Sequence, residues 1–448
     1  MTTTINNEHK KLNVPNKQEQ NQTCLDSAER QGLRPKGNVP NLRFPEFQGE
    51  WEELGLSELL DFKNGLNPKP DKFGKGIKFI SVMDILNNAV ITYDCIKASV
   101  DVTEKELSDF SVEKGDILFQ RSSETLEDVG RANVYMDDKT AVFGGFVIRG
   151  KKKGEYDPRY FNYLLRSPFA RKRIIPMGAG AQHFNIGQEG LSKVKLHFAN
   201  IEEQKKIGKM LSLLDERIAT QNKIIEDLKK LKSAIVEKVF CSPNQEYPMC
   251  RIEGFEHALS TYKMSDFSSR IASKNKDSKC SLVLTIAAQY GLVNQESFFN
   301  KSVASDNLTG YYLLHKGEFA YNRSYSAGYD WGAVKRLDNY DEGVLSTLYI
   351  CFKINETIVD SDYLAYYFES SKWHKGLSDI AGEGARNHGL LNVSITDYFN
   401  TKHRFPVIEE QKAIAKMLNT ITEKERKATL LGECYQKQKQ YLLCQMFI

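Results

Sequence analysis

Two stretches of the chain distribute apolar and polar residues with the period of a long helix. Between residues 201 and 240, apolar side chains recur at alternating steps of three and four, which is the a/d pattern of a coiled coil. Residues 408–448 keep a weaker form of the same pattern. We therefore predict two long helices that each present an apolar seam. The predicted seam residues are Ile207, Leu211, Leu214, Ile218, Ile225 and Leu228 in the first helix and Ile414, Leu418, Ile421, Tyr435 and Leu442 in the second.

The two stretches are also copies of one another. Residues 201–240 and 408–447 align without a gap at an offset of 207, with 14 of 40 positions identical, and both begin Ile-Glu-Glu-Gln-Lys. Asn200 and Glu203 have the spacing of a capping box at the first helix start. Glu425, Gly432 and Lys439 interrupt the second seam, so the second helix is the weaker one by itself. A repeat this long indicates a duplicated unit of one domain followed by one helix.

The segments between the helices carry the short apolar runs of strands, separated by Gly, Asn and Asp. The runs in the first segment are Ile77–Val82, Asp116–Phe119, Arg131–Met136 and Ala141–Ile148. Asp157-Pro158 and Ser167-Pro168 are typical helix starts. The landmark Lys114-Gly115-Asp116 returns as Lys316-Gly317-Glu318. The pattern predicts an α+β protein with two homologous domains, each a small curved β-sheet with short helices.

The order of these features predicts the domain organisation. We expect a disordered leader at 1–38, a first domain at 39–200, a helix at 201–240, a linker at 241–257, a second domain at 258–407 and a helix at 408–448. Each helix would be a rod of roughly 60 Å. The second domain starts where the first helix ends and finishes where the second helix starts. Antiparallel pairing lets a compact domain make that connection, so we predict an antiparallel two-helix coiled coil with pseudo-twofold symmetry.

Composition and charge narrow the class of protein. The net charge is only +4, but residues 151–240 hold 19 Lys/Arg against 10 Asp/Glu, which suits contact with phosphates or a solvated helix face. The eight cysteines form no Cys-x-x-Cys pair, so zinc sites and disulfides are disfavoured and a reducing cytoplasm fits. No run is long and apolar enough for a membrane span, and no signal peptide opens the chain.

The sequence carries no specific catalytic motif. It has neither a phosphate-binding loop nor a Gly-x-Gly-x-x-Gly fingerprint. Phe143-Gly-Gly-Phe146 and Asp157-Pro-Arg-Tyr160 are only distantly similar to adenine methyltransferase motifs, because the glycine spacing and the second proline are missing. We therefore predict no catalytic residue, no metal ligand and no cofactor bound by this chain. Two matched domains on a rigid spacer suit a protein that holds two DNA-reading surfaces at a fixed separation.

Polar side chains that could read base edges occur at matched places in both domains. Glycines beside them would let the backbone approach phosphates. The shared Arg-Ser pair has an alternative reading as a hydrogen bond within each domain. The candidate DNA contacts are Arg121, Ser122, Ser123, Arg131, Asn133, Gln182, His183 and Asn185 in the first domain and Arg323, Ser324, Tyr325, Arg386, Asn387 and His388 in the second.

The repeated Ile-Glu-Glu-Gln-Lys helix start, the Lys-Gly-Asp/Glu turn and the opening Asn-Leu-Arg-Phe-Pro-Glu-Phe at 41–47 resemble the specificity subunits of type I restriction–modification systems, in particular those of Gram-positive cocci. The resemblance implies two target-recognition domains, each reading half of an interrupted site in double-stranded DNA, and helices that set the gap. Such subunits do not catalyse. They bind two methylation subunits, which use S-adenosylmethionine, and two restriction subunits, which use ATP and Mg²⁺.

On that reading, apolar residues outside the seam are candidates for docking the partner subunits. These residues are Leu213, Ile224, Leu231, Leu430, Leu431 and Leu443. The alternative function is a coiled-coil adaptor that presents two protein-binding domains. A sequence-specific, interrupted DNA footprint would distinguish the two functions.

Overall fold

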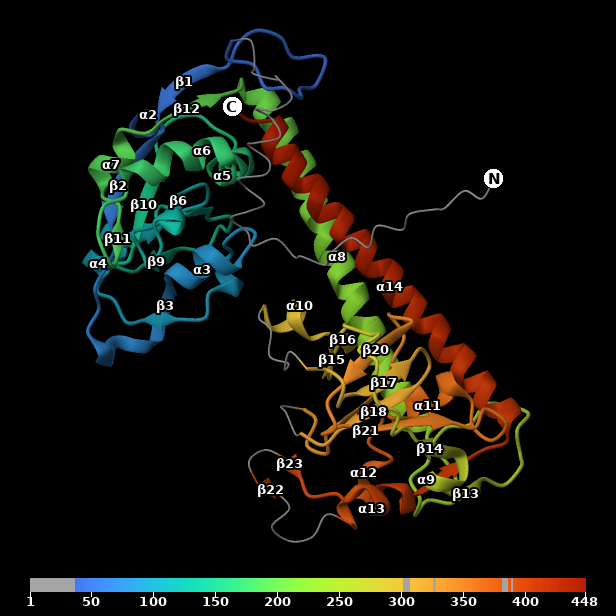
Figure 1. The fold of residues 1–448 in the computed structure, drawn as a ribbon. Helices are drawn as coiled ribbons and strands as arrows, with labels where there is room; N and C mark the ends of the chain where they lie inside the picture. Colours follow the sequence, from blue (N-terminus) through green and yellow to red (C-terminus); the bar gives the residue numbers. More distant parts are fainter. Residues whose placement is uncertain (1–36, 301–306, 325–327, 381–385, 388–389) are drawn as a thin grey trace, which may run out of the picture. The chain divides into compact units, whose positions relative to one another are not determined.

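The computed structural model describes residues 37–300, 307–324, 328–380, 386–387 and 390–448, so almost all of the expected leader lies outside the described residues. The chain divides into two compact units (Figure 1). The first unit consists of the chain up to Asn222 together with Leu430–Ile448, and the second of Lys223–Thr429. Each unit therefore contains one part of each long helix.

The first unit is built on two four-stranded sheets. One has the order β2-β10-β6-β8 and is antiparallel throughout. The other has the order β4-β3-β9-β5, in which β3 and β9 are parallel. The strands are β1 (Glu52–Gly55), β2 (Leu60–Asn64), β3 (Phe73–Ile80), β4 (Ser99–Val100), β5 (Ser111–Val112), β6 (Ile117–Gln120), β7 (Ser122–Ser123), β8 (Ala132–Val134), β9 (Ala141–Phe143), β10 (Val147–Lys152), β11 (Phe184–Asn185) and β12 (Lys195–Phe198).

Short helices cover these sheets. They are α2 (Leu56–Leu59), α3 (Val82–Asn87), α4 (Glu104–Phe110), α5 (Pro158–Arg166), α6 (Pro168–Ile174) and α7 (Gln188–Ser192), with single 3₁₀ turns η1 (Pro70–Lys72), η2 (Tyr93–Cys95), η3 (Leu126–Asp128) and η4 (Ile175–Met177). The side chains of Asp157 and Ser167 accept hydrogen bonds from the first turns of α5 and α6, as their sequence predicted.

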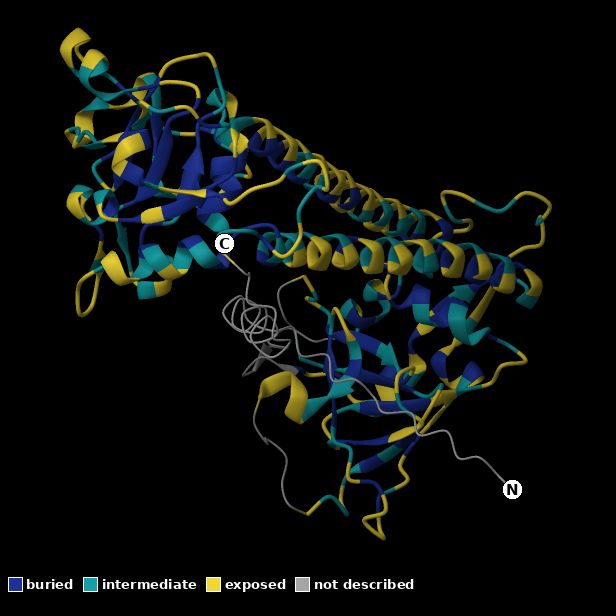
Figure 2. Ribbon diagram, turned by 90° about the horizontal axis from the view of Figure 1, so that it is seen from above, coloured by how far each residue is buried: buried dark blue, intermediate teal, exposed yellow. Residues whose placement is uncertain are grey.

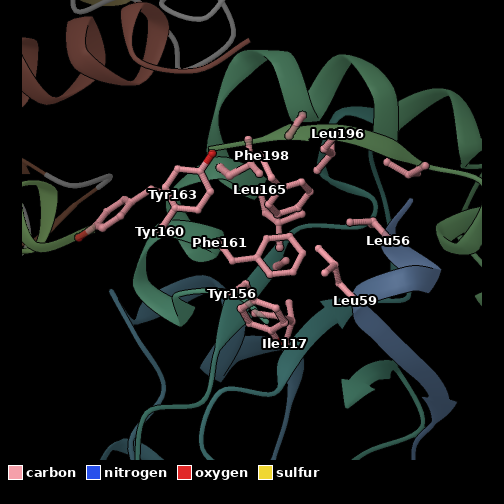
Figure 3. Packing of buried hydrophobic residues seen from close by; sticks show 14 of the residues in the cluster. Leu56, Leu59, Ile117, Tyr156, Tyr160, Phe161, Tyr163, Leu165, Leu196 and Phe198 are labelled. Carbon is pink, nitrogen blue, oxygen red and sulfur yellow. The ribbon is translucent and has the colours of Figure 1, made fainter. Parts of the chain in front are cut away.

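The core of the first unit lies between α5 and the strands beneath it. Figure 3 shows Tyr160, Phe161 and Leu165 of α5 close to Leu196 and Phe198 of β12. The rings of Phe161 and Phe198 are 5.2 Å apart in an edge-to-face contact, which is a favoured aromatic geometry. This core fixes α5, and α5 in turn contacts the long helices.

The second unit repeats the first antiparallel sheet. Its order β14-β21-β18-β19 matches β2-β10-β6-β8 strand for strand. The strands of the second unit are β13 (Ser260–Lys263), β14 (Ser268–Arg270), β15 (Leu284–Ala287), β16 (Gly291–Asn294), β17 (Tyr312–His315), β18 (Phe319–Asn322), β19 (Ala333–Arg336), β20 (Glu342–Leu345), β21 (Ile350–Ile354), β22 (Arg386–Asn387), β23 (Leu390–Leu391) and β24 (Lys402–Phe405). Its short helices are α9 (Met264–Phe267), α10 (Gln295–Phe299), α11 (Ser361–Tyr367), α12 (His374–Ser378) and α13 (Ile395–Asn400).

The two long helices are α8 (Ile201–Val239) and α14 (Ile408–Gln445). All the predicted seam residues are buried or half-buried, and Figure 2 shows exposed residues alternating with them along both helices. In the first unit Ile207 and Leu211 share a cluster with Phe447. In the second unit Val236 shares a cluster with Ile414 and Leu418. The start of each helix thus packs with the end of the other, so the pairing is antiparallel and the predicted α+β fold is confirmed.

The polar residues in the second seam have partners on the first helix. Lys439 Nζ lies 2.5 Å from Asp215 Oδ1 in the first unit. Glu425 Oε2 lies 3.4 Å from Lys232 Nζ in the second unit. Half-buried charges that pair only in one alignment favour that alignment over others. These residues weaken the isolated helix but specify how it pairs.

Among the described residues, no helix combines the length and the apolar character that crossing a membrane requires.

Candidate nucleic-acid interface

The repeated Ile-Glu-Glu-Gln-Lys motif joins each long helix to the domain before it. In the first unit Arg43 donates two hydrogen bonds to Glu203, from Nε at 2.8 Å and from Nη2 at 2.7 Å. Gln204 Oε1 accepts from the backbone N–H of Asp157 at 3.0 Å, directly before α5. The Gln204 Nε2 donates to the Ala199 carbonyl at 2.8 Å. The motif therefore fixes the domain to the start of α8.

The second unit reproduces these contacts. Arg251 donates from Nε and Nη2 to Glu410 at 2.8 and 2.7 Å. Gln411 Oε1 accepts from the backbone N–H of Asp360 at 2.9 Å. The match between Arg43 and Arg251 was not predicted from the sequence. The signal was available, because each arginine stands nine residues before the first strand of its unit and 159 or 160 residues before its glutamate.

A polar surface lies at one end of the first unit's antiparallel sheet. Strand β6 leads through Arg121 into β7, and β7 pairs with β11, which opposes Ser123 to Phe184 and Ser122 to Asn185. Ser122 and Ser123 are half-buried, while Gln182, His183 and Asn185 are exposed. We call these five residues the polar rim. The structure thus brings together candidate DNA contacts that are about 60 residues apart in the sequence.

A hollow of about 850 Å³ adjoins the polar rim. Ser122, Ser123 and His183 line it on one side. Most of the remaining wall is apolar, including Phe79, Met83 and Phe146, but the acidic side chains of Glu124 and Asp128 also line it. A mostly apolar hollow with a few polar groups at its edge is the usual form of a binding site.

The shared arginine holds a turn inside each unit. Arg121 donates from Nη1 to the Gly145 carbonyl at 3.3 Å, and its backbone N–H donates to the Phe146 carbonyl at 2.9 Å. Arg323 donates from Nε and Nη2 to the Leu348 carbonyl at 3.3 and 3.1 Å. In the structure, both guanidinium groups therefore make hydrogen bonds within their own domain, which is the alternative interpretation of the shared Arg-Ser pair.

Two other candidates of the first domain differ in their surroundings. Arg131 forms a half-exposed ion pair with Asp128, at 2.5 Å between Nη2 and Oδ1. Asn133 has 0 % of its surface exposed, and its Nδ2 donates to the carbonyls of Ile85 and Asn88 at 3.0 and 2.8 Å. The prediction that Asn133 contacts DNA is wrong, because its amide is enclosed by the domain and satisfied there.

The second domain's candidates are described only in part. Ser324 is half-buried, and its backbone N–H donates to the side chain of Asn322. Arg386 and Asn387 form strand β22, which pairs with β23, and their backbone alone is described. Tyr325 and His388 lie outside the described residues. Within the parts of the chain that are described, no group of three His, Cys, Asp or Glu side chains could hold a metal ion.

Comparison with known proteins identifies the first domain and its helix. Residues 48–230 match the model of the type I restriction modification DNA specificity domain family. Residues 48–230 are therefore a domain of this specificity family, and the relatives that match the chain over most of its length are named as specificity subunits. These subunits are the non-catalytic part of type I systems, so the prediction that the chain is not itself an enzyme is confirmed.

Relatives of this specificity subunit cover most of its length. It is 25% identical over 408 residues to the protein named as the MjaX type I restriction enzyme specificity subunit of Methanocaldococcus jannaschii, covering 86% of this chain and 90% of that one. It is 23% identical to the MjaVIII specificity subunit of the same organism, covering 85% and 87%. A shorter match of 138 residues at 25% identity, covering 30% and 28%, is to the EcoKI specificity subunit of Escherichia coli.

Solved structures share the fold. The type I restriction–modification S subunit from M. genitalium superposes with a TM-score of 0.53 at 16% identity, covering 92% of this chain and 99% of that one. A chain from a structure of type I R-M complex assembly and conformational transition has a TM-score of 0.50 at 13% identity, covering 88% and 96%.

Proposed function

We propose that each globular domain of this specificity subunit reads one half of an interrupted site in double-stranded DNA, and that the helix pair sets the gap between the halves. The observation that carries this proposal is that one scaffold occurs twice with different surfaces. The sheet orders match and the anchoring arginines match. The polar residues at the corresponding places in the sequence do not match: the first domain has Gln182, His183 and Asn185, and the second has Arg386, Asn387 and His388.

The polar rim is the proposed DNA-reading surface of the first domain. Serine, glutamine, histidine and asparagine side chains make directional hydrogen bonds to base edges in the major groove. Arg131 is half-exposed and suits a phosphate contact. In the second domain we propose Ser324, Tyr325, Arg386, Asn387 and His388 for the same task. Arg121 and Arg323 contribute by holding the adjacent turns.

The outer faces of the long helices are proposed to dock the partner subunits. Leu213, Ile224, Leu231, Leu430 and Leu431 are exposed apolar residues on these helices. Leu443 differs, because it packs against the core of the first unit. We propose a cytoplasmic assembly with two methylation and two restriction subunits. The partners would bind S-adenosylmethionine, ATP and Mg²⁺.

Methylome sequencing tests the proposal. A host that expresses the chain with its methylation partner should carry methylated adenine in one interrupted motif. Replacing residues 50–195 by those of another specificity subunit should change one half of the motif and leave the other half unaltered. A change in both halves would contradict the modular reading. The absence of any motif, with intact assembly of the complex, would favour the adaptor function.

A further inference from the structure

Each unit holds a large apolar side chain out into solvent at the same point of its fold. Phe146 is 70 % exposed at the tip of the turn between β9 and β10, and Leu348 is 58 % exposed at the tip of the turn between β20 and β21. Strand pairing sets β10 against β6 and β21 against β18, which places both tips beside the arginine that follows the central strand. We call these segments, residues 143–147 and 345–350, the tip turns.

The first tip turn is held by backbone contacts on several sides. Leu66 donates its backbone N–H to the Phe143 carbonyl at 3.0 Å, and Gly144 donates to the Ile80 carbonyl at 3.0 Å. A Cβ on Gly65 would lie 2.1 Å from the Gly144 carbonyl oxygen, and a Cβ on Gly144 would lie 2.6 Å from the ring of Phe79. A Cβ on Gly145 would lie 1.9 Å from Asn67 Oδ1, so both residues of the Gly-Gly pair stand where a side chain would collide with a neighbour. The turn that carries Phe146 is therefore hydrogen-bonded and closely packed against its neighbours.

The second tip turn is supported by its arginine. The guanidinium of Arg323 donates twice to the Leu348 carbonyl, and its Nη1 donates to the Val393 carbonyl at 3.1 Å. Tyr349 closes the turn by donating its backbone N–H to the Ser346 carbonyl at 3.2 Å. Both units thus use the same arginine position to hold an exposed apolar tip.

We propose that Phe146 and Leu348 are wedges that insert between stacked base pairs of the DNA, one in each half-site. This inference rests on the proposed function. In proteins that bind the minor groove, phenylalanine and leucine side chains unstack base steps in this way, and unstacking costs a few kcal/mol per step. A turn that carries a wedge must keep its conformation while the side chain unstacks the bases. A side chain that only touches a thymine methyl group does not need a turn held in this way. The support of both tip turns therefore favours insertion.

The surroundings of Phe146 fit this role. Ser122, Ser123 and His183 of the polar rim line the same hollow as Phe146, so the tip is continuous with the proposed reading surface. The hollow also leaves space beside the ring for a base that moves aside. Because the tip is Phe in one domain and Leu in the other, each wedge would favour the base step that its own shape unstacks most readily.

The test uses the assembled complex of this chain with its methylation partner and a duplex that carries the motif found by methylome sequencing. 2-Aminopurine replaces one base at a time across both half-sites, and its fluorescence rises where a base loses its stacking. The wild-type complex should show a rise at one step per half-site in addition to any rise at the methylated adenine. Phe146→Ala should abolish the rise in the first domain's half-site only and weaken binding about 10-fold or more. Leu348→Ala should do the same in the other half-site.

Conservative variants separate the wedge from general damage. Phe146→Leu, which copies the second domain's tip, should retain the signal that Phe146→Ala loses. In Phe146→Ala and in Leu348→Ala, the fluorescence rise at the methylated adenine should remain. Unchanged fluorescence and affinity in Phe146→Ala would overturn the proposal. Replacing thymine by uracil in the duplex removes the methyl groups; if this lowers affinity as much as Phe146→Ala does, with stacking unchanged, the proposal is also overturned. A Phe146→Ala variant that binds DNA normally but no longer assembles with its partner would overturn it as well. Failure of the wild-type complex to bind any motif would instead count against the proposed function.

Discussion

Two buried glutamates show how single residues organise this protein. The side chains of Glu203 and Glu410 are 0 % and 1 % exposed, and each is neutralised by one arginine. The hydrogen bonds that Arg43 and Arg251 donate to these glutamates raise the pKa of both arginines. A buried carboxylate that loses its partner is left uncompensated in a low-dielectric site. The pair therefore fixes the segment before each domain to the start of the following helix.

Arg43→Ala should destabilise the first unit by about 3–5 kcal/mol, because Glu203 stays buried without its partner. Arg43→Lys should recover only part of that loss, since an ammonium cannot donate the two parallel hydrogen bonds of a guanidinium. The free energy of unfolding is measured by urea titration, with hydrogen exchange of the α5 amides reporting on the first unit. Lys193→Ala, which removes an exposed pair with Glu189, is the matched control and should cost less than about 1 kcal/mol. Equal effects of Arg43→Ala and Lys193→Ala would contradict this account.

His403 makes the second unit sensitive to acid. Burial lowers the pKa of His403 to about 3, and its ring nitrogens contact the hydroxyls of Tyr367 and Thr401 at 3.0 and 2.8 Å. In the unfolded chain the imidazole binds a proton near pH 6.5. The unfolded state therefore gains protons first, and stability should fall as pH decreases below about 6.5, by roughly 1.4 kcal/mol per pH unit.

Position 403 corresponds to Leu196 of the first domain, since β12 and β24 hold equivalent places against β1 and β13. His403→Leu should therefore flatten the pH dependence of the second unit, although it leaves two hydroxyls without their partner. Thermal unfolding at pH 7 and at pH 4.5 compares the two proteins. A slope in His403→Leu as steep as in the wild type would assign the acid sensitivity to other groups.

At the scale of elements, each long helix ends inside the domain that the other helix starts from. Phe447 at the end of the chain packs against Trp51 and Tyr160, with ring centroids 6.4 and 5.5 Å apart. Phe240 after α8 packs against Tyr363 and Tyr367 at 5.0 and 5.7 Å. Each domain is thus completed by residues from both helices, which couples helix pairing to domain folding.

Phe447→Ala should destabilise the first unit by about 3–5 kcal/mol, because it removes a buried ring and leaves a cavity between Trp51 and Tyr160. Phe240→Ala should have the same effect on the second unit. Hydrogen exchange in α5 and in α11 reports the two units separately. Leu430→Ala, which truncates an exposed side chain, should change stability by about 0.5 kcal/mol or less. Faster exchange in both helices after either phenylalanine change would show that the units unfold together.

At the scale of the whole molecule, the duplication accounts for the proposed division of labour. The contacts that hold each domain to its helix are repeated almost atom for atom, while the residues around the sheet ends have diverged. Polar pairs across the seam fix how the helices align. With the alignment fixed, the length of the helices can set the proposed gap between the half-sites.

Insertion of seven residues into each helix, after Asn222 and after Thr429, should lengthen the gap in the recognised motif by about 3 base pairs. Seven helical residues add about 10 Å, and the duplex rises about 3.4 Å per base pair. Methylome sequencing measures the gap. Seven residues added to the 241–257 segment serve as the control and should leave the gap unaltered. A gap that stays constant with the longer helices would show that they are not the spacer.

Much of the fold could be predicted from local patterns. The heptad repeat identified α8 and α14, the caps at Asp157 and Ser167 identified α5 and α6, and the aligned landmarks identified two copies of one domain. The strand predicted over Ala141–Ile148 was wrong in its middle, where the Gly-Gly turn separates β9 from β10. Nothing in a period-two pattern distinguishes a continuous strand from two strands that meet at a tight turn.

The sequence by itself determined the helices, their seam, the duplication and the family, because these depend on periodicity and on self-similarity along the chain. Only the tertiary structure decided which polar residues are exposed. Asn133 and Ser122 are equally polar in the sequence, yet one is enclosed and the other lines a surface. Arg43 and Glu203 are 160 residues apart and carry no local signal of their contact. Burial and pairing of polar groups depend on residues distant along the chain, and folding alone brings those residues together.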